Sequence, residues 1–195
     1  MLLSFLSLRE PMESGLVTIS RAARQASFPA RFQLVAAMNP CPCGHLGDGT
    51  DRCHCTTEQV QRYRRRVSGP FLDRIDLQIE VPALPRAELL KDQPDAEDSA
   101  TIRKRVIAAR AIQLERAGKA NAHLSHKERE RHCRIGEPEQ RLLERAMQRL
   151  NLSARGLHRI LKVARSVADL AASPDIDADH LTEAIALRRL DIRKP

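Results

Sequence analysis

Residues 153–172 of this chain read SARGLHRILKVARSVADLAA, a segment with a regular apolar pattern. Its apolar side chains recur every three or four residues, which places them on one face of an α-helix: Leu157, Ile160, Leu161, Ala164, Val167, Ala168 and Ala171. A helix with such a stripe has to bury it against other elements. Ser153 predicts the amino-terminal cap, because a serine hydroxyl accepts amide protons of the first turn.

The sequence on both sides of this segment predicts further helices. They cover residues 100–117, 125–132, 137–150 and 177–189, and Asp177 is the expected cap of the last one. Residues 91–99 are acidic, contain a proline and have few apolar side chains, which is typical of a linker. We therefore expect an all-helical domain over residues 100–195, joined by a linker at 91–99 to a domain at 1–90.

The first ninety residues predict a mixture of strands and helices. Strands are expected at 17–20, 32–37 and 75–81, where short apolar or alternating runs are bounded by loops and prolines. A basic helix is expected from Thr57 to about Val67. The fold class is therefore α/β in the first part, followed by an all-α bundle.

Composition and charge restrict the class of protein. The 195 residues are 42% hydrophobic and 30% charged, as in a soluble globular protein, and the net charge is +8. A basic surface favours an anionic partner such as nucleic acid or nucleotide. No apolar run approaches the roughly 20 residues that span a bilayer, so we expect a cytoplasmic protein with no membrane partner.

Four cysteines lie in a polar loop at residues 39–56. Cys41 and Cys43 are separated by nine residues from Cys53 and Cys55, so that two C-x-C pairs could converge on one ion. Zinc is the expected ion, because it prefers four thiolates in a tetrahedron. Two alternatives stay open: the thiols could be redox-active, or they could be reduced and hold no ligand.

Several segments resemble a known family. They are Arg9-Glu10-Pro11, the run from Val17 to Ala22, the run AAMNPCPCG at 36–44, SGPFLDRID at 68–76, and LSARG at 152–156 followed by HRILKVAR at 158–165. The chain resembles the magnesium-chelatase-like AAA+ ATPases of the ComM and YifB type over almost its whole length. The resemblance implies an incomplete AAA+ core at residues 1–90 and a lid domain at residues 100–195.

The resemblance also implies roles for three residues. Asn39 matches sensor 1, which orients the water that attacks the γ-phosphate, whereas an Asn-Pro pair taken alone predicts a turn. Arg74 matches the arginine finger, whereas an arginine between two aspartates taken alone predicts a surface ion pair. Arg155 matches sensor 2 in the lid, and we expect Arg159 and Arg165 on the same helix to be solvated or interface charges.

The sequence contains no G-x-x-x-x-G-K-[ST] loop, the segment that holds the phosphates of ATP in this class. Residues 1–8 also differ from the family pattern before Arg9-Glu10-Pro11. The chain therefore resembles a truncated family member, and we expect no ATP turnover from it alone.

The leading hypothesis is that the chain supplies sensor 1, the arginine finger and sensor 2 to an ATP-driven motor. By resemblance, this motor is a hexamer that uses ATP with Mg²⁺ and acts on DNA in competence or recombination. Its partners would be full-length AAA+ subunits or further copies of the chain. The alternatives are a zinc-stabilised nucleic-acid-binding module, suggested by the cysteines and by the basic residues 62–66, and an inactive remnant.

Overall fold

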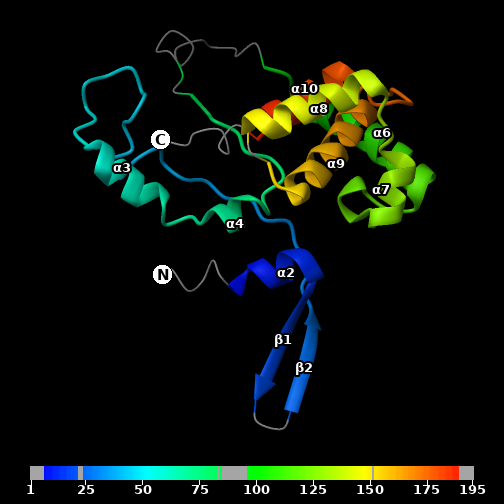
Figure 1. Ribbon diagram of the computed structural model, residues 1–195, viewed down its shortest axis with the longest axis horizontal. Coiled ribbons are helices and arrows are strands. Elements are labelled where there is room, and N and C mark those ends of the chain that lie inside the picture. Colours follow the sequence, from blue (N-terminus) through cyan, green and yellow to red (C-terminus); the bar gives the residue numbers. More distant parts are fainter. Residues whose placement is uncertain (1–6, 22–23, 83, 85–95, 151, 189–195) are drawn as a thin grey trace. The chain divides into compact units, whose positions relative to one another are not determined.

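The structure is a computed structural model that describes residues 7–21, 24–82, 84, 96–150 and 152–188 (Figure 1). The chain divides into two compact units, Met1–Ile75 and Asp76–Pro195. Residues 91–95 of the predicted linker lie outside the described residues, and the division into domains at 1–90 and 100–195 stays a prediction. No helix in the described part of the chain is both long and apolar enough to cross a bilayer.

The first unit begins with a short helix and a hairpin. Helix α2 (Arg9–Ser14) ends at Gly15, whose φ of 68° lies in the left-handed region that favours glycine. Strands β1 (Leu16–Arg21) and β2 (Arg24–Pro29) then pair antiparallel, with Leu16 opposite Pro29 and Arg21 opposite Arg24. The strand predicted at 17–20 is therefore confirmed. Helices α3 (Thr57–Arg64) and α4 (Gly69–Leu72) follow the cysteine loop.

The two other predicted strands are wrong. Residues 32–37 are irregular, and residues 75–81 contain a single isolated bridge, between Gln78 and Arg188. A strand needs a neighbour for its amide and carbonyl groups, and within the described residues neither segment has a partner strand. Their apolar side chains are correspondingly exposed, with Val35 84% and Val81 85% accessible.

The second unit is helical, as predicted. Its elements are α6 (Ser99–Ala117), the 3-10 turn η1 (Asn121–His123), α7 (His126–His132), α8 (Glu137–Leu150), α9 (Ala154–Leu170) and α10 (Ala178–Ala186). Both predicted caps are present. The Ser153 hydroxyl accepts the Gly156 amide at 3.1 Å. The Asp177 carboxylate accepts the Asp179 and His180 amides, each at 3.0 Å.

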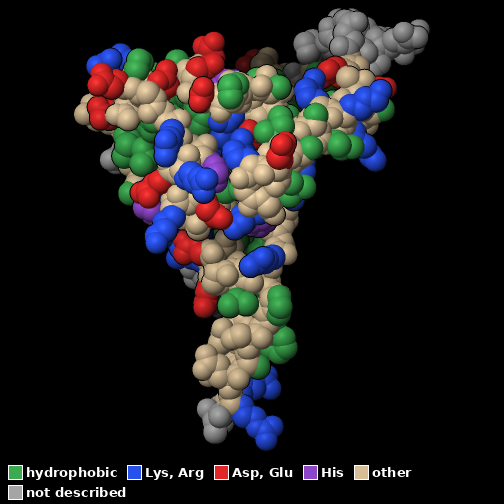
Figure 2. Space-filling model, turned by 90° about the vertical axis from the view of Figure 1, so that its right-hand side faces the viewer, with side chains coloured by type: hydrophobic (Ala, Val, Ile, Leu, Met, Phe, Trp, Pro, Cys, Tyr) green, Lys and Arg blue, Asp and Glu red, His purple; other side chains and the backbone are tan. Residues whose placement is uncertain are grey.

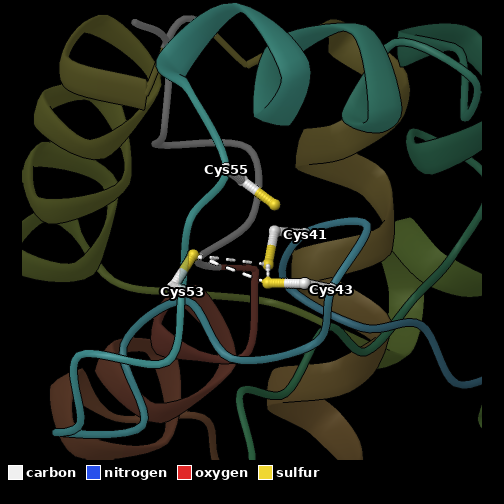
Figure 3. A group of neighbouring side chains, drawn as sticks. All are labelled: Cys41, Cys43, Cys53 and Cys55. Carbon is white, nitrogen blue, oxygen red and sulfur yellow. Dashed lines mark hydrogen bonds between the residues drawn. The ribbon is translucent and has the colours of Figure 1, made fainter.

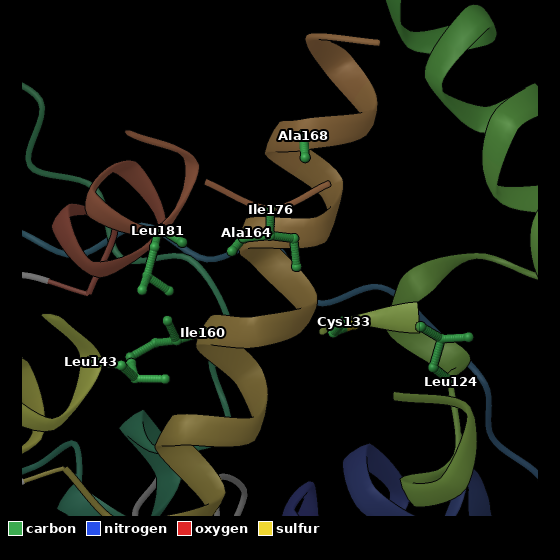
Figure 4. Close-up of a cluster of buried hydrophobic side chains, with 9 residues drawn as sticks. Leu124, Cys133, Leu143, Ile160, Ala164, Ala168, Ile176 and Leu181 are labelled. Carbon is green, nitrogen blue, oxygen red and sulfur yellow. The ribbon is translucent and has the colours of Figure 1, made fainter. Parts of the chain in front are cut away.

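Helix α9 provides the centre of the hydrophobic core (Figure 4). Ile160, Ala164 and Ala168 on one face of α9 are fully buried. They pack with residues from the surrounding elements: Leu124, Cys133, Leu143, Ile176, Leu181 and Ala184. The stripe predicted from the sequence is therefore the core face of the helix, although Ala171 is exposed because α9 ends at Leu170.

A buried ionic network lies beside this core. The Asp169 carboxylate accepts two hydrogen bonds from Arg116, at 2.6 and 2.7 Å, one from Asn121 at 2.7 Å and one from Arg165 at 3.1 Å. Burial alone would raise the pKa of Asp169, but these hydrogen bonds and positive charges outweigh burial and lower it. We expected Arg165 to be a solvated or interface charge, but it is not solvated: the residue is 2% exposed, and its charge is balanced by Asp169 one helical turn away.

Candidate functional site

The four cysteines of the loop come together. The sulfur atoms of Cys41, Cys43, Cys53 and Cys55 all lie within 4.8 Å of one another (Figure 3). The Sγ of Cys53 is 3.8 Å from that of Cys41 and 3.7 Å from that of Cys43. Four thiolates at about 2.3 Å from a tetrahedral zinc ion would be about 3.8 Å apart. The sulfur atoms of the free thiols, of which those of Cys41 and Cys43 are 3.3 Å apart, are therefore close enough to converge on one tetrahedral ion.

The loop between the two cysteine pairs is folded around Asp48. Its carboxylate accepts hydrogen bonds from the amide of Thr50 at 2.9 Å, from the Thr50 hydroxyl at 2.6 Å and from Arg52 at 2.8 Å. The ring of His45 lies 3.1 Å from the same carboxylate. The hydrogen bonds from Thr50, helped by His45 and Arg52, lower the pKa of Asp48 to about 2. Asp48 is thus an anion that orders the turn between the cysteine pairs.

Both ends of the loop are fixed to helix α3. Directly after Cys55, Thr56 and Gln59 form a capping box, in which each side chain accepts the other residue's amide, at 2.9 and 3.2 Å. The Nε of Arg64 donates to the carbonyl of Pro40 at 3.4 Å, next to Cys41. The helix therefore holds the entry and the exit of the loop together.

The thiols affect one another's ionisation. Burial would raise the pKa of Cys41, but hydrogen bonds with Cys43 and with the backbone of Leu46 and Gly44 lower it to about 6. For Cys55, a backbone hydrogen bond with Cys43 favours the thiolate. It is outweighed by the side-chain hydrogen bond with Cys43, by burial and by the negative charge of Cys41, which together raise the pKa to about 11. A divalent cation would remove this conflict, because it stabilises all four thiolates at once.

Asn39, the predicted sensor 1 residue, lies beside the cysteine loop. Its side chain is exposed. A Cβ atom placed on Gly44 would be 3.5 Å from the Asn39 amide nitrogen, and Gly44 has a φ of 86°. The backbone turn that follows Cys43 thus packs directly against Asn39, so the fold of the loop and the orientation of this side chain are linked.

Arg74, the predicted arginine finger, follows helix α4 in the same unit. Its guanidinium forms an ion pair with Glu13 at 3.0 Å and donates to the carbonyl of Pro70, and the side chain is 12% exposed. The ion pair was expected from the sequence, although the partner was not. Its position next to the end of α4 is fixed by backbone turns from Gly69 to Asp73 and from Phe71 to Arg74.

Arg155, the predicted sensor 2 residue, belongs to the second unit. It is exposed in the first turn of α9, two residues after the cap at Ser153. One turn further along α9, Arg159 forms an ion pair with Asp76. The amide of Gln78 donates to the carbonyl of Leu187, at the end of α10, at 2.6 Å. The segment 76–78, which begins two residues after Arg74 in the sequence, is thereby attached to both helices.

Sequence reasoning missed Asp48 and Asp76. For Asp48 a signal exists, because an aspartate two residues before a threonine in a glycine-rich segment favours a turn closed by its side chain. For Asp76 no local pattern identifies the partner, since Arg159 is 83 residues away.

Comparison with known proteins agrees with the resemblance found in the sequence. Residues 4–89 match the family model of magnesium chelatase subunit ChlI, and residues 96–188 match that of the ChlI C-terminal region. The chain is 50% identical over 184 residues to the competence protein ComM of Haemophilus influenzae, covering 94% of this chain and 36% of that protein. It is 46% identical over 185 residues to the uncharacterized protein YifB of Escherichia coli, covering 95% of this chain and 36% of YifB. The chain thus spans about a third of the length of these relatives.

Proposed function

We propose, from the premise that this chain belongs to the magnesium chelatase ChlI family, that it supplies nucleotide-sensing residues to an ATP-driven DNA-processing motor. The observation that carries this proposal is the match to both family models, together with 50% identity to ComM. The word competence in the name of that relative motivates the DNA-processing part. By the family resemblance, the motor is a hexamer of AAA+ subunits.

In this proposal Arg74 acts on a nucleotide held by a neighbouring subunit. Its planar, permanently charged fork suits the charge that develops on the transferred phosphoryl group. It would exchange Glu13 for phosphate oxygens, so Glu13 keeps the finger paired until a nucleotide arrives. When a nucleotide phosphate replaces the Glu13 carboxylate, the guanidinium keeps a negative partner throughout.

Arg155 and Asn39 act on the nucleotide from the lid and from the core. The exposure of Arg155 at the start of α9 suits a contact with the γ-phosphate. The amide of Asn39 can both donate and accept, as orientation of the attacking water requires. The ATP and its Mg²⁺ would be held by a G-x-x-x-x-G-K-[ST] loop that lies outside these 195 residues.

We further infer that the cysteine loop holds one structural zinc ion through Cys41, Cys43, Cys53 and Cys55. Zinc would supply the folding energy of a loop that has little apolar packing of its own. Since Gly44 packs against Asn39, the ion would also fix the direction of the sensor 1 side chain.

Reconstitution of ATP hydrolysis tests the proposed function. The purified chain alone is expected to show no turnover. Mixed with a family polypeptide that carries a G-x-x-x-x-G-K-[ST] loop, it should give hydrolysis that Arg74→Ala and Arg155→Ala each reduce by about 10³-fold, the order of magnitude lost with an arginine finger. A coupled spectroscopic assay of phosphate release measures the rate of the chain alone and the rates of the mixtures.

The matched control is Arg103→Ala, which removes an exposed arginine of α6 outside the proposed site. It should leave the reconstituted rate within twofold. Turnover by the chain alone that depends on Arg74 or Arg155 would contradict the assignment, and so would equal losses in the control and the two variants.

A second candidate function is a zinc-stabilised nucleic-acid-binding module. It is favoured by the cluster of thiols next to the basic helix α3. Loss of DNA affinity on substitution of Arg62 and Arg65, with no ATP hydrolysis in any mixture, would support this candidate over the first.

A further inference from the structure

The β1–β2 hairpin has two faces of different chemistry. Paired residues of an antiparallel ladder point to the same side, and successive pairs alternate. One face therefore carries the pairs Val17 and Phe28, Ile19 and Ala26, and Arg21 and Arg24. The other face is mainly polar, and on it the Thr18 and Ser27 hydroxyls are 3.1 Å apart.

Every residue of both strands is exposed. Figure 2 shows the hairpin at the lower end of the view, with hydrophobic side chains along one edge and basic side chains close to its tip. Phe28 is 51% accessible and Ile19 is 50% accessible. An apolar surface that ends in positive charge is therefore open to a ligand within the first unit.

The two arginines of this face are directly opposite each other in the register. Like charges in such cross-strand positions repel and destabilise the pair. Residues 16–31 contain a third arginine, Arg31, and no acidic residue. Among the described residues, no hydrogen bond or ion pair offsets the charge of Arg21 or Arg24. An anion between the two guanidinium groups would remove the repulsion.

We propose that this face of the hairpin binds single-stranded nucleic acid, with Arg21 and Arg24 on the phosphates and Phe28 against a base. The inference rests on the DNA partner of the proposed function and assigns it a surface. Arginine forks hold phosphate oxygens in pairs, and exposed aromatic rings stack on bases that a duplex would hide. Along the strands, Phe28 and Arg24 are about 13 Å apart, so both can contact one strand.

The basic helix α3 is less suited to this role. Arg62 forms an ion pair with Glu58 at 3.2 Å, and Arg64 donates to the Pro40 carbonyl. The guanidinium of Arg66 lies 6.0 Å from the centre of the Tyr63 ring. These arginines already have partners, which nucleic acid would have to displace.

Fluorescence anisotropy with the full chain tests the inference in the absence of nucleotide. The probes are a labelled oligo-dT strand, a DNA duplex and an oligo-U strand of the same length. The double variant Arg21→Ala, Arg24→Ala should bind the single strand at least tenfold more weakly at low salt. The slope of log K against log salt should fall by about 1.4, since each phosphate contact on a single strand contributes about 0.7.

Phe28→Ala should weaken single-strand binding several-fold and leave the salt slope unchanged, because it removes stacking and no charge. The matched control Arg62→Ala, Arg65→Ala, with one substitution in α3 and one at its C-cap, should change the affinity less than twofold. Circular dichroism of each variant confirms that the fold is retained. Equal affinity for the DNA and RNA strands supports binding through phosphates and bases, which both strands contain. Tighter binding of one of them identifies that nucleic acid as the ligand.

Three results would overturn the inference. Loss of binding in the α3 variant alone would move the DNA surface to α3 and leave the proposed motor intact. Tighter binding of the duplex, unaffected by Phe28→Ala, would exclude stacking. Absence of binding, with self-association that Phe28→Ala abolishes in light scattering, would make the hairpin a protein-binding surface. None of these results changes the outcome of ATP reconstitution, so the two proposals fail separately.

Discussion

At the scale of the residue, Asp169 is a buried charge of the helical unit that depends on several partners. Its carboxylate is fully buried and shared by Arg116, Asn121 and Arg165. Arg165 also donates to the carbonyls of Ser173 and Pro174, at 2.6 and 2.7 Å, in the turn after α9. Removing a buried charge leaves its partners uncompensated, which costs more than an intact pair contributes.

We therefore expect Asp169→Asn to lower the free energy of unfolding by about 3 kcal/mol. The amide keeps the shape of the side chain and removes the charge that two arginines require. Urea unfolding followed by circular dichroism measures the change. The control, Asp175→Asn, alters an exposed aspartate, and its free energy of unfolding should stay within about 0.5 kcal/mol of the unchanged chain. Similar losses in the two variants would show that the network does not stabilise the fold.

At the scale of the element, the cysteine loop shows how a segment without a core can be ordered. The residues from Asn39 to Thr56 form turns, held by Asp48 inside and by α3 at both ends. In this segment Cys41 is fully buried, and the other three thiols surround it. A metal ion would be the centre around which such a loop folds.

We expect the purified chain to bind one zinc ion, and cobalt in its place to show the visible absorption of a tetrahedral thiolate site. Cys53→Ser should lower the metal affinity by more than about tenfold, because a lost ligand costs more than a lost outer contact. Cys133→Ala, which removes the cysteine in the helical core, should keep one ion per chain. Metal binding that depends on Cys133 and not on Cys53 would refute the site.

At the scale of the whole molecule, the two units are stabilised by different means. The buried hydrophobic cluster of the second unit draws on α9, α10 and their neighbours. In the described part of the first unit, few apolar side chains are buried, among them Val60 and Phe71, and the thiol cluster adds a further buried centre at Cys41. Loss of metal should therefore affect the units unequally.

We expect chelation by EDTA to increase amide hydrogen exchange in residues 39–64 while α9 and α10 keep their protection. The reason is that local opening depends on local contacts, and the helical core contains none of the four cysteines proposed to hold the metal. Hydrogen exchange with mass spectrometry compares the two states. An equal rise in both units would show that the metal, or its removal, acts on the chain as a whole.

The sequence by itself determined the helical half and the proximity of the four cysteines. The apolar spacing of residues 157–168 fixes which face of α9 is buried, because helix geometry is local. Ser153 and Asp177 mark helix starts for the same reason, since a cap bonds amides two or three residues away. The two C-x-C pairs are close enough in the chain for the loop to bring them together.

Only the tertiary structure decided the long-range partners. Asp169 meets Arg116 across 53 residues, and Asp76 meets Arg159 across 83. Strand β1 pairs with the immediately following β2, whereas the apolar run at 32–37 is irregular. A short apolar run indicates that its side chains can be buried. Which residues they pack against depends on how distant segments of the chain fold together. Local chemistry thus fixed the helices and the cysteine cluster, and three-dimensional packing decided which charges and which strands came into contact.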